Sequence, residues 1–301
     1  MITRKIIETG LLWSLVMLGL SSCDSDIDPL VTDDDVAYVN FYNAAEALTV
    51  NVSLRTDNMV YINDSVRTEI FSYPSFDAGK TDKRQYPEYF QPHSPVVPPG
   101  IGYDPVLWLP MQAGEYKFIY TSGAKEFLKD TTCLLNGKGA FHTFYLTESP
   151  EADNSYKIVV VPENPPLNTG RVNLRVVHLG TDAGELSFKR ITAQGAEEQG
   201  LPQKVPFGTY SEHVAIDTAG VALTQNKIPI RVFRNNLNGE QEEVMTVLVP
   251  PVLNSTFTLL VQGFLNSTSR RIQTGRNLDN TPAYTRVTVP SNFRVHVRRL
   301  N

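Results

Sequence analysis

The sequence predicts an all-β protein made of two tandem antiparallel β-sandwich domains. Short runs with apolar residues at every second position fill the chain, while apolar residues at helical spacing are nearly absent. Glycine, proline, asparagine and aspartate separate these runs, which is typical of sandwiches. The same order of runs occurs twice in a chain of 301 residues, a length that itself suggests two domains. We therefore expect two copies of one sandwich.

The start of the chain, residues 1–22, has the pattern of a lipoprotein signal peptide. Arg4 and Lys5 are basic, and the apolar run 11–20 is too short to span a bilayer comfortably. This run ends in Leu20-Ser21-Ser22-Cys23, which resembles a bacterial lipobox. Acyl chains on Cys23 would anchor the mature chain to a membrane. The alternative is an ordinary signal peptide with a chance cysteine.

An acidic segment, residues 23–35, follows the leader and is expected to be a solvated tether. The aspartates next to Cys23 resemble the acidic export signal of Bacteroidetes surface lipoproteins. That resemblance implies a lipid anchor in the outer membrane with the protein on the cell surface, although an anchor facing the periplasm stays open. The net charge of −5 argues against nucleic-acid binding, which usually needs a basic domain.

The predicted first sandwich covers residues 36–161, and a proline-rich linker at 162–170 separates it from the second sandwich at 171–301. The strands expected in the first copy are 37–43, 47–55, 59–63, 106–111, 115–121, 131–135, 140–147 and 155–161. In the second copy, run 229–234 corresponds to run 115–120 of the first, and run 256–261 corresponds to run 141–146. The order therefore repeats even where identity is low.

Each copy opens with a strand that ends in a polar residue before a turn of small residues. Asn43 holds this place in the first copy and His178 in the second. A side chain that hydrogen-bonds the following turn explains both residues. A ligand-binding role for His178 is the less favoured alternative.

The first copy carries an insertion at about 73–108 that the second lacks. It is rich in proline, which prevents regular sheet pairing, and long connections in compact domains are often functional. Its candidate ligand-binding residues are Tyr86, Tyr89, Phe90, Tyr103 and Trp108, because aromatic rings stack on sugars or anchor a partner protein. The alternative is a loop that packs its own aromatic rings against the sandwich.

A family resemblance is carried by Arg175-Val176-Val177-His178 and by the later runs Phe207-Gly208-Thr209-Tyr210 and Asp217-Thr218-Ala219-Gly220. They resemble the family catalogued as domain of unknown function 4397. Members are immunoglobulin-like β-sandwiches, often in tandem, in bacterial surface and secreted lipoproteins. The resemblance implies that fold and an extracytoplasmic setting, and no activity. Members often carry Ser-Pro-Asp-Ala-Pro after the polar residue, and this chain departs from it at Leu179-Gly180-Thr181.

The sequence offers little support for chemistry. No two histidines have the spacing of zinc ligands, and no glycine-rich phosphate loop or nucleophile elbow is present. Cys133, in a strand-like run, is expected to be a small buried side chain with no disulfide partner. Acidic pairs such as Glu242 and Glu243 are expected to be solvated. We therefore expect no cofactor, no metal and no catalytic residues.

The last run, 293–299, alternates apolar and basic residues. We expect a final strand with a charged outer face that discourages edge pairing. A patch for anionic glycans is the alternative. Taken together, the sequence predicts a non-enzymatic, lipid-anchored cell-envelope protein that binds an extracellular glycan or protein. The alternatives are a fimbria-like structural subunit that exchanges a strand and, less favoured, a hydrolase that acts on glycans.

Overall fold

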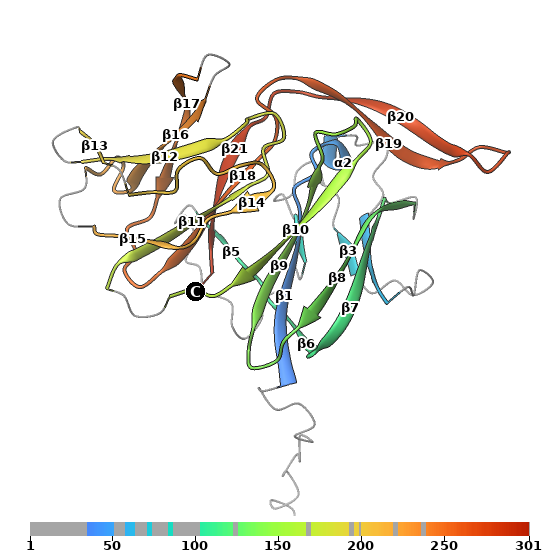
Figure 1. Ribbon diagram of the computed structural model, residues 1–301, viewed down its shortest axis with the longest axis horizontal. Coiled ribbons are helices and arrows are strands. Elements are labelled where there is room, and N and C mark those ends of the chain that lie inside the picture. Colours follow the sequence, from blue (N-terminus) through green and yellow to red (C-terminus); the bar gives the residue numbers. More distant parts are fainter. Residues whose placement is uncertain are drawn as a thin grey trace, which may run out of the picture.

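The computed structural model describes residues 35–50, 58–63, 71–73, 84–86, 103–122, 126–166, 170–192, 196–198, 200–218, 222–235 and 239–300. Nearly all of the regular structure is β, so the all-β prediction is confirmed (Figure 1). In these parts of the chain no helix is long and apolar enough to cross a membrane. The sheets form two units that lie side by side.

The first unit consists of two sheets. Its inner sheet has the order β10-β9-β1-β4, with β6 also paired to β1. Its outer sheet has the order β3-β2-β7-β8. The inner strands are β1 (Val36–Asn43), β4 (Gln85–Tyr86), β6 (Leu109–Gln112), β9 (Phe141–Glu148) and β10 (Tyr156–Glu163). The outer strands are β2 (Asn58–Ile62), β3 (Phe71–Tyr73), β7 (Gly114–Thr121) and β8 (Phe127–Leu135). Aromatic rings such as Phe41, Phe118 and Phe144 fill the core between the sheets.

The second unit repeats this plan. Its inner sheet has the order β14-β11-β18-β21-β5, with β15 also paired to β11, and its outer sheet has the order β13-β12-β16-β17. The inner strands are β11 (Val172–His178), β14 (Thr209–Tyr210), β15 (Val214–Ile216), β18 (Thr256–Gln262), β21 (Arg294–Arg299) and β5 (Asp104–Pro105). The outer strands are β12 (Leu186–Ile191), β13 (Glu197–Glu198), β16 (Ile228–Asn235) and β17 (Gln241–Val249). Aliphatic residues such as Leu174, Ile230 and Leu259 fill this second core.

The pairing of the central strands is the same in both units. In the first, β1 lies parallel to β9, which pairs with antiparallel β10. In the second, β11 lies parallel to β18, which pairs with antiparallel β21. The units differ between the last two strands. A short turn joins β9 to β10, whereas a long hairpin of β19 (Thr268–Arg276) and β20 (Pro282–Val289) separates β18 from β21.

The two inner sheets pack against each other, so the molecule has four sheet layers (Figure 1). Tyr42, Tyr145 and Val161 of the first unit share one buried cluster with Val177 and Leu260 of the second. In each strand these residues alternate with residues of the unit's own core. The inner sheets are thus buried on both faces, which explains why β1 and β11 are buried along their whole length.

Two local predictions need correction. The segment 47–55 was expected to be a strand, but its described part forms the single-turn helix α2 (Ala47–Val50). This turn is stabilised locally, because the Thr49 amide and hydroxyl both donate to the Glu46 carbonyl. The charged face of 293–299 was expected to be solvated, but Arg298 of β21 is buried against the first unit. The outer edge of β21 is covered by β5, which the insertion of the first unit supplies.

Candidate functional site

The polar residues at the ends of β1 and β11 bind the turns that follow them. Asn43 Oδ1 accepts from the Ala45 amide at 2.9 Å. His178 Nδ1 accepts from the Gly180 amide at 3.2 Å, and its Nε2 donates to the Gly184 carbonyl at 2.8 Å. Both contacts confirm the turn-binding prediction. Burial lowers the pKa of His178 to about 4, so the neutral ring is the form that makes these bonds.

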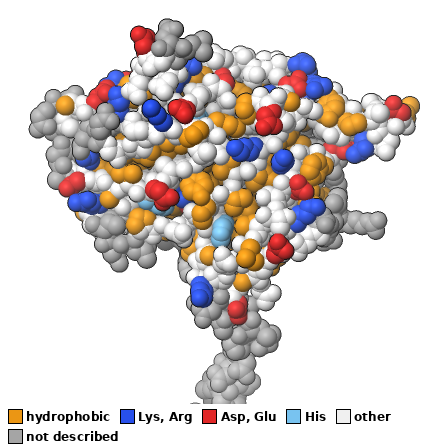
Figure 2. Space-filling model, viewed as in Figure 1, with side chains coloured by type: hydrophobic (Ala, Val, Ile, Leu, Met, Phe, Trp, Pro, Cys, Tyr) orange, Lys and Arg blue, Asp and Glu red, His pale blue; other side chains and the backbone are white. Residues whose placement is uncertain are grey.

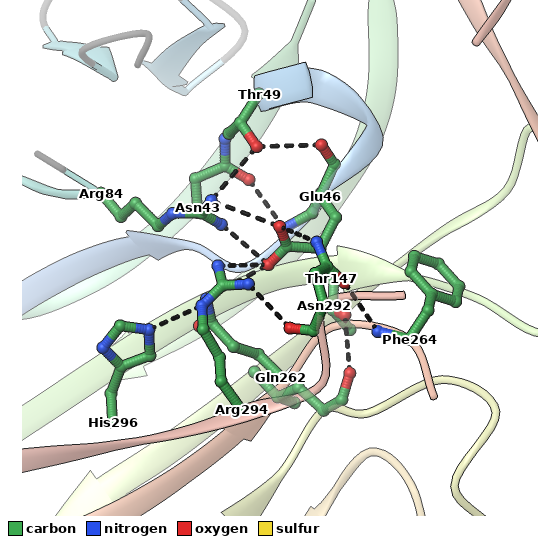
Figure 3. A network of polar contacts seen from close by, with 12 residues as sticks. Asn43, Glu46, Thr49, Arg84, Thr147, Gln262, Phe264, Asn292, Arg294 and His296 are labelled. Atoms are coloured by element: carbon green, nitrogen blue, oxygen red, sulfur yellow. Dashed lines mark hydrogen bonds and ion pairs between the residues drawn. The ribbon is translucent and has the colours of Figure 1, made fainter. Parts of the chain in front are cut away.

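The turn after Asn43 places Glu46 in the junction between the units, where its carboxylate is the centre of a buried network (Figure 3). Arg84 Nη1 donates to it at 3.0 Å from the insertion. Three donors come from the second unit: Arg294 Nη2 at 2.7 Å, Asn292 Nδ2 at 2.8 Å and Gln262 Nε2 at 3.2 Å. A buried carboxylate is thereby both neutralised and hydrogen-bonded, as burial of a charge requires.

A second acid, Glu148, lies at the end of β9 next to this network. Its Oε1 accepts from the Ala47 amide at 2.7 Å. Burial and, to a smaller extent, the neighbouring charge of Glu46 raise the pKa of Glu148 to about 7, against the lowering effects of the Ala47 amide and Arg270. Glu148 thus has its midpoint near neutral pH in the folded protein.

Two more charged clusters lie between the inner sheets. Arg298 Nη1 donates to Tyr145 Oη and its Nη2 to Asn40 Oδ1, each at 2.9 Å, while the guanidinium lies 4.5 Å from the Tyr42 ring centre. Glu163 and Arg175 form a fully buried ion pair near the other end of the junction. The junction therefore combines apolar contact with charges that are satisfied only when both units are in place.

This arrangement suits a structural clamp. The carboxylates of Glu46 and Glu163 are held by guanidinium groups and are buried, so a substrate could reach neither acid without separating the units. Among the described residues, no group of three or more histidine, cysteine, aspartate or glutamate side chains could hold a metal ion. Cys133 is partly buried, and burial raises its pKa, which lowers the reactivity of a thiol.

Two of the predicted aromatic binding residues, Tyr103 and Trp108, lie apart from each other in the interior. Tyr103 and Trp108 are 8 % and 1 % exposed, and they pack in two different clusters. Tyr103 lies in the core of the second unit, where it contacts Phe257 edge to face. Trp108 packs against Phe141. Both rings therefore follow the alternative in which the insertion packs its own aromatics.

The other predicted site residues are less informative. The backbone of Tyr86 pairs with that of Phe41 in the inner sheet. Tyr89, Phe90 and the lipidation residue Cys23 lie outside the described residues.

The hairpin of β19 and β20 forms an arm that the sequence analysis did not identify. Figure 1 shows the arm leaving the second unit, crossing the first unit and extending beyond it. Its base packs on α2, where Ile272, Val287 and Val289 share a buried cluster with Ala47. The buried guanidinium of Arg270 donates to two carbonyls of the β9–β10 turn, each at 3.0 Å.

The outer half of the arm is also tied to the first unit. Arg271 and Arg286 both pair with Asp153, and Arg276 pairs with Glu126 at 3.0 Å. The turn at the tip is closed by internal hydrogen bonds, including Asn277 N to Thr281 O at 2.9 Å. Leu278 at this tip is fully exposed. The arm thus holds one aliphatic side chain in water on a turn closed by hydrogen bonds.

A comparison with models of known protein families finds no match, and a comparison with curated proteins finds none either. The resemblance to the domain of unknown function therefore stays a prediction.

Proposed function

We propose that this chain is a non-enzymatic, lipid-anchored protein of the cell envelope, exposed on the cell surface, that binds another protein through the tip of its β19–β20 arm. The observation that carries the proposal is the exposed Leu278 on an arm that is fixed to both units. When a partner covers an aliphatic side chain presented in this way, the burial stabilises the complex by about 25 cal/mol per Å² of apolar surface.

The junction supports this role because it makes the arm a fixed part of the body. The arm leaves the second unit next to Asn292, and its base rests on α2 directly after Glu46. The Glu46 carboxylate binds residues of both units. It therefore connects the part of the second unit from which the arm leaves with α2, on which the base of the arm packs. A contact element that is ordered before binding loses less entropy on association.

The same observations favour a protein partner over a glycan and over catalysis. Two of the five aromatic rings that were expected to stack on sugars, Tyr103 and Trp108, are used in packing. The acids that lie together, Glu46 and Glu148, are sealed inside the junction. The lipid anchor rests on the leader and Cys23 alone. The fimbria-like role by strand exchange stays a prediction.

Site-specific crosslinking on intact cells that make the protein tests the proposal. A photo-reactive group at position 278 should give a discrete adduct with a second protein, and the same group at exposed Thr288 near the arm base should not. Pre-incubation with excess protein should suppress the adduct, whereas excess Leu278→Ser protein should not. Surface location is read separately, by protease treatment of intact cells. Equal adducts at both positions, or protection from protease, would overturn the proposal.

A further inference from the structure

β17 is the last strand of the outer sheet in the second unit. Eight of its nine residues pair with β16, and no strand of the described chain pairs with its other side. The unpaired amides and carbonyls of such an edge are a template for another strand. Proteins usually protect edges with charged side chains or prolines within the strand.

The free edge of β17 has little of this protection. Its residues 244–249 are Val-Met-Thr-Val-Leu-Val, without a charge or a proline. Other long strands at sheet edges are different: β8 carries Lys129 and Asp130, and β20 carries Pro282 and Arg286. A bulge beside Phe233 interrupts the pairing with β16 only at the acidic end of β17. The uncharged end is therefore regular and open to pairing.

The distribution of charge identifies a second copy of this chain as the occupant. Antiparallel pairing about a two-fold axis at Thr246 sets residues 244–248 of each β17 against residues 248–244 of the other, and sets Val249 opposite Glu243. The glutamates 242 and 243 of one copy then lie about 20–26 Å from the same glutamates of the other copy, beyond the range of unscreened repulsion. A parallel arrangement would place like charges side by side.

The same arrangement brings opposite charges together. Ile228 of β16 pairs with Val249 of β17, so Lys227 lies beside the end of β17 that has no acid. In the two-fold arrangement Glu243 of the second copy lies opposite Val249, and Glu242 follows one residue further along, opposite Pro250. Lys227 is then two strand spacings, about 10 Å, from the glutamates of the second copy, within reach of a lysine side chain, and the symmetry gives this attraction twice.

We propose that two copies of this chain associate through their β17 edges, in antiparallel pairing about a two-fold axis near Thr246, to join their outer sheets. The side chain of Thr246 is exposed and lies opposite Arg231 in the sheet. Thr246 of one copy then faces Thr246 of the other across the axis. A lysine at this position would set two like charges against each other, which destabilises cross-strand pairing.

Sedimentation of the chain from residue 24 onward, over a range of protein concentrations, tests this pairing. The unchanged protein should shift from monomer to dimer as concentration rises. Thr246→Lys should weaken the dimer at least ~10-fold, because of the facing charges. Thr288→Lys, an exposed position on the edge strand β20, should leave it unchanged. Circular dichroism establishes that each variant is folded.

Disulfide crosslinking gives a second readout that does not depend on the lysine variant. In a Cys133→Ser background, Thr246→Cys should form a covalent dimer under mild oxidation, whereas Thr288→Cys should not. A protein that stays monomeric at every concentration overturns the proposal. A dimer that persists in Thr246→Lys and gives no crosslink at position 246 overturns it as well, because another surface then holds the copies together.

Discussion

Arg294 and Glu46 are separated by 248 positions in the sequence, yet Arg294 Nη2 donates to Glu46 Oε1 at 2.7 Å. Arg84 binds the same carboxylate at 3.0 Å. One buried anion therefore connects the first turn of the first unit, the insertion and the last strand of the second unit (Figure 3). The packing of the two units against each other therefore depends on a carboxylate at position 46.

Glu46→Gln should destabilise the protein strongly. The substitution keeps the shape of the side chain but removes its charge, which leaves the guanidinium of Arg84 buried without an anion. Removing one partner of a buried ion pair costs about 3–5 kcal/mol. Urea unfolding of the variant should show a loss of this order in the free energy of unfolding.

A matched control is Glu242→Gln. Glu242 also pairs with an arginine, Arg234, but its side chain is 51 % exposed. Exposed pairs contribute about 0–1 kcal/mol, so this variant should unfold almost like the unchanged protein. Equal losses in the two variants would contradict the view that burial makes the Glu46 clamp important.

Stability should depend on pH through Glu148. Its pKa is raised from 4.5 to about 7 in the folded protein, so between these values the folded state keeps a proton that the unfolded state has released. The contribution of Glu148 to the free energy of unfolding is therefore fully present below pH ~4.5 and is lost as pH rises through 7. The total loss is up to about 3 kcal/mol. Glu148→Gln stays neutral, so its free energy of unfolding should lack this decline.

The neighbours of Glu148 determine how that experiment is read. Glu46, Arg270 and Tyr156 are the charged and titratable groups that interact with it. His178 and His213, whose pKa values burial lowers to about 4, act in the opposite direction. The difference between the unchanged protein and Glu148→Gln at each pH isolates the carboxyl. A difference that is constant from pH 4.5 to 8 would show that Glu148 titrates normally.

His178 should make the protein sensitive to acid. Protonation of Nδ1 removes the acceptor that binds the Gly180 amide, and the unfolded state takes up this proton more readily. The contribution of His178 is complete above pH ~6.5 and is lost as pH falls through about 4. His178→Asn copies the residue of the first unit, so it should keep the turn contact and lose this pH dependence. Thermal unfolding at pH 4 and pH 8 would measure it.

The repeated turns and the all-β fold were predictable because they depend on local pattern. Asn43 and His178 end alternating runs and precede small residues, and each acts on an amide two positions later. Contacts of such short range leave a signal in the sequence.

The junction and the arm could not be predicted because their partners are distant in the sequence. Arg298 alternates with valines, which indicates a strand with a solvated face; only the packing of a second unit turns that face into an interior. The short helix at Ala47–Val50 adds a distant contact to its local ones, because the Ala47 amide donates to Glu148, about a hundred residues away. Leu278 gave no periodic signal, since it lies in the turn of a hairpin.

Trp108 offers the sharpest test of packing against ligand binding in the insertion. Its ring is buried against Phe141, with ring centroids 4.9 Å apart. Trp108→Ala should lower the free energy of unfolding by about 3–5 kcal/mol, the usual cost of removing a large buried ring. Trp108→Phe should cost much less, because the indole Nε1 is buried without a hydrogen-bond partner in the described chain and its loss removes an unsatisfied donor.

Leu278→Ala is the control for that series, since exposed substitutions usually change stability by less than about 0.5 kcal/mol. Differential scanning calorimetry of the three variants would rank them as Trp108→Ala, then Trp108→Phe, then Leu278→Ala in order of loss. A residue kept for ligand contact alone would give the reverse result, with an unchanged melting temperature for Trp108→Ala. That outcome would make the insertion a candidate ligand-binding site again, and it would mean that the interior position of the Trp108 ring is wrong.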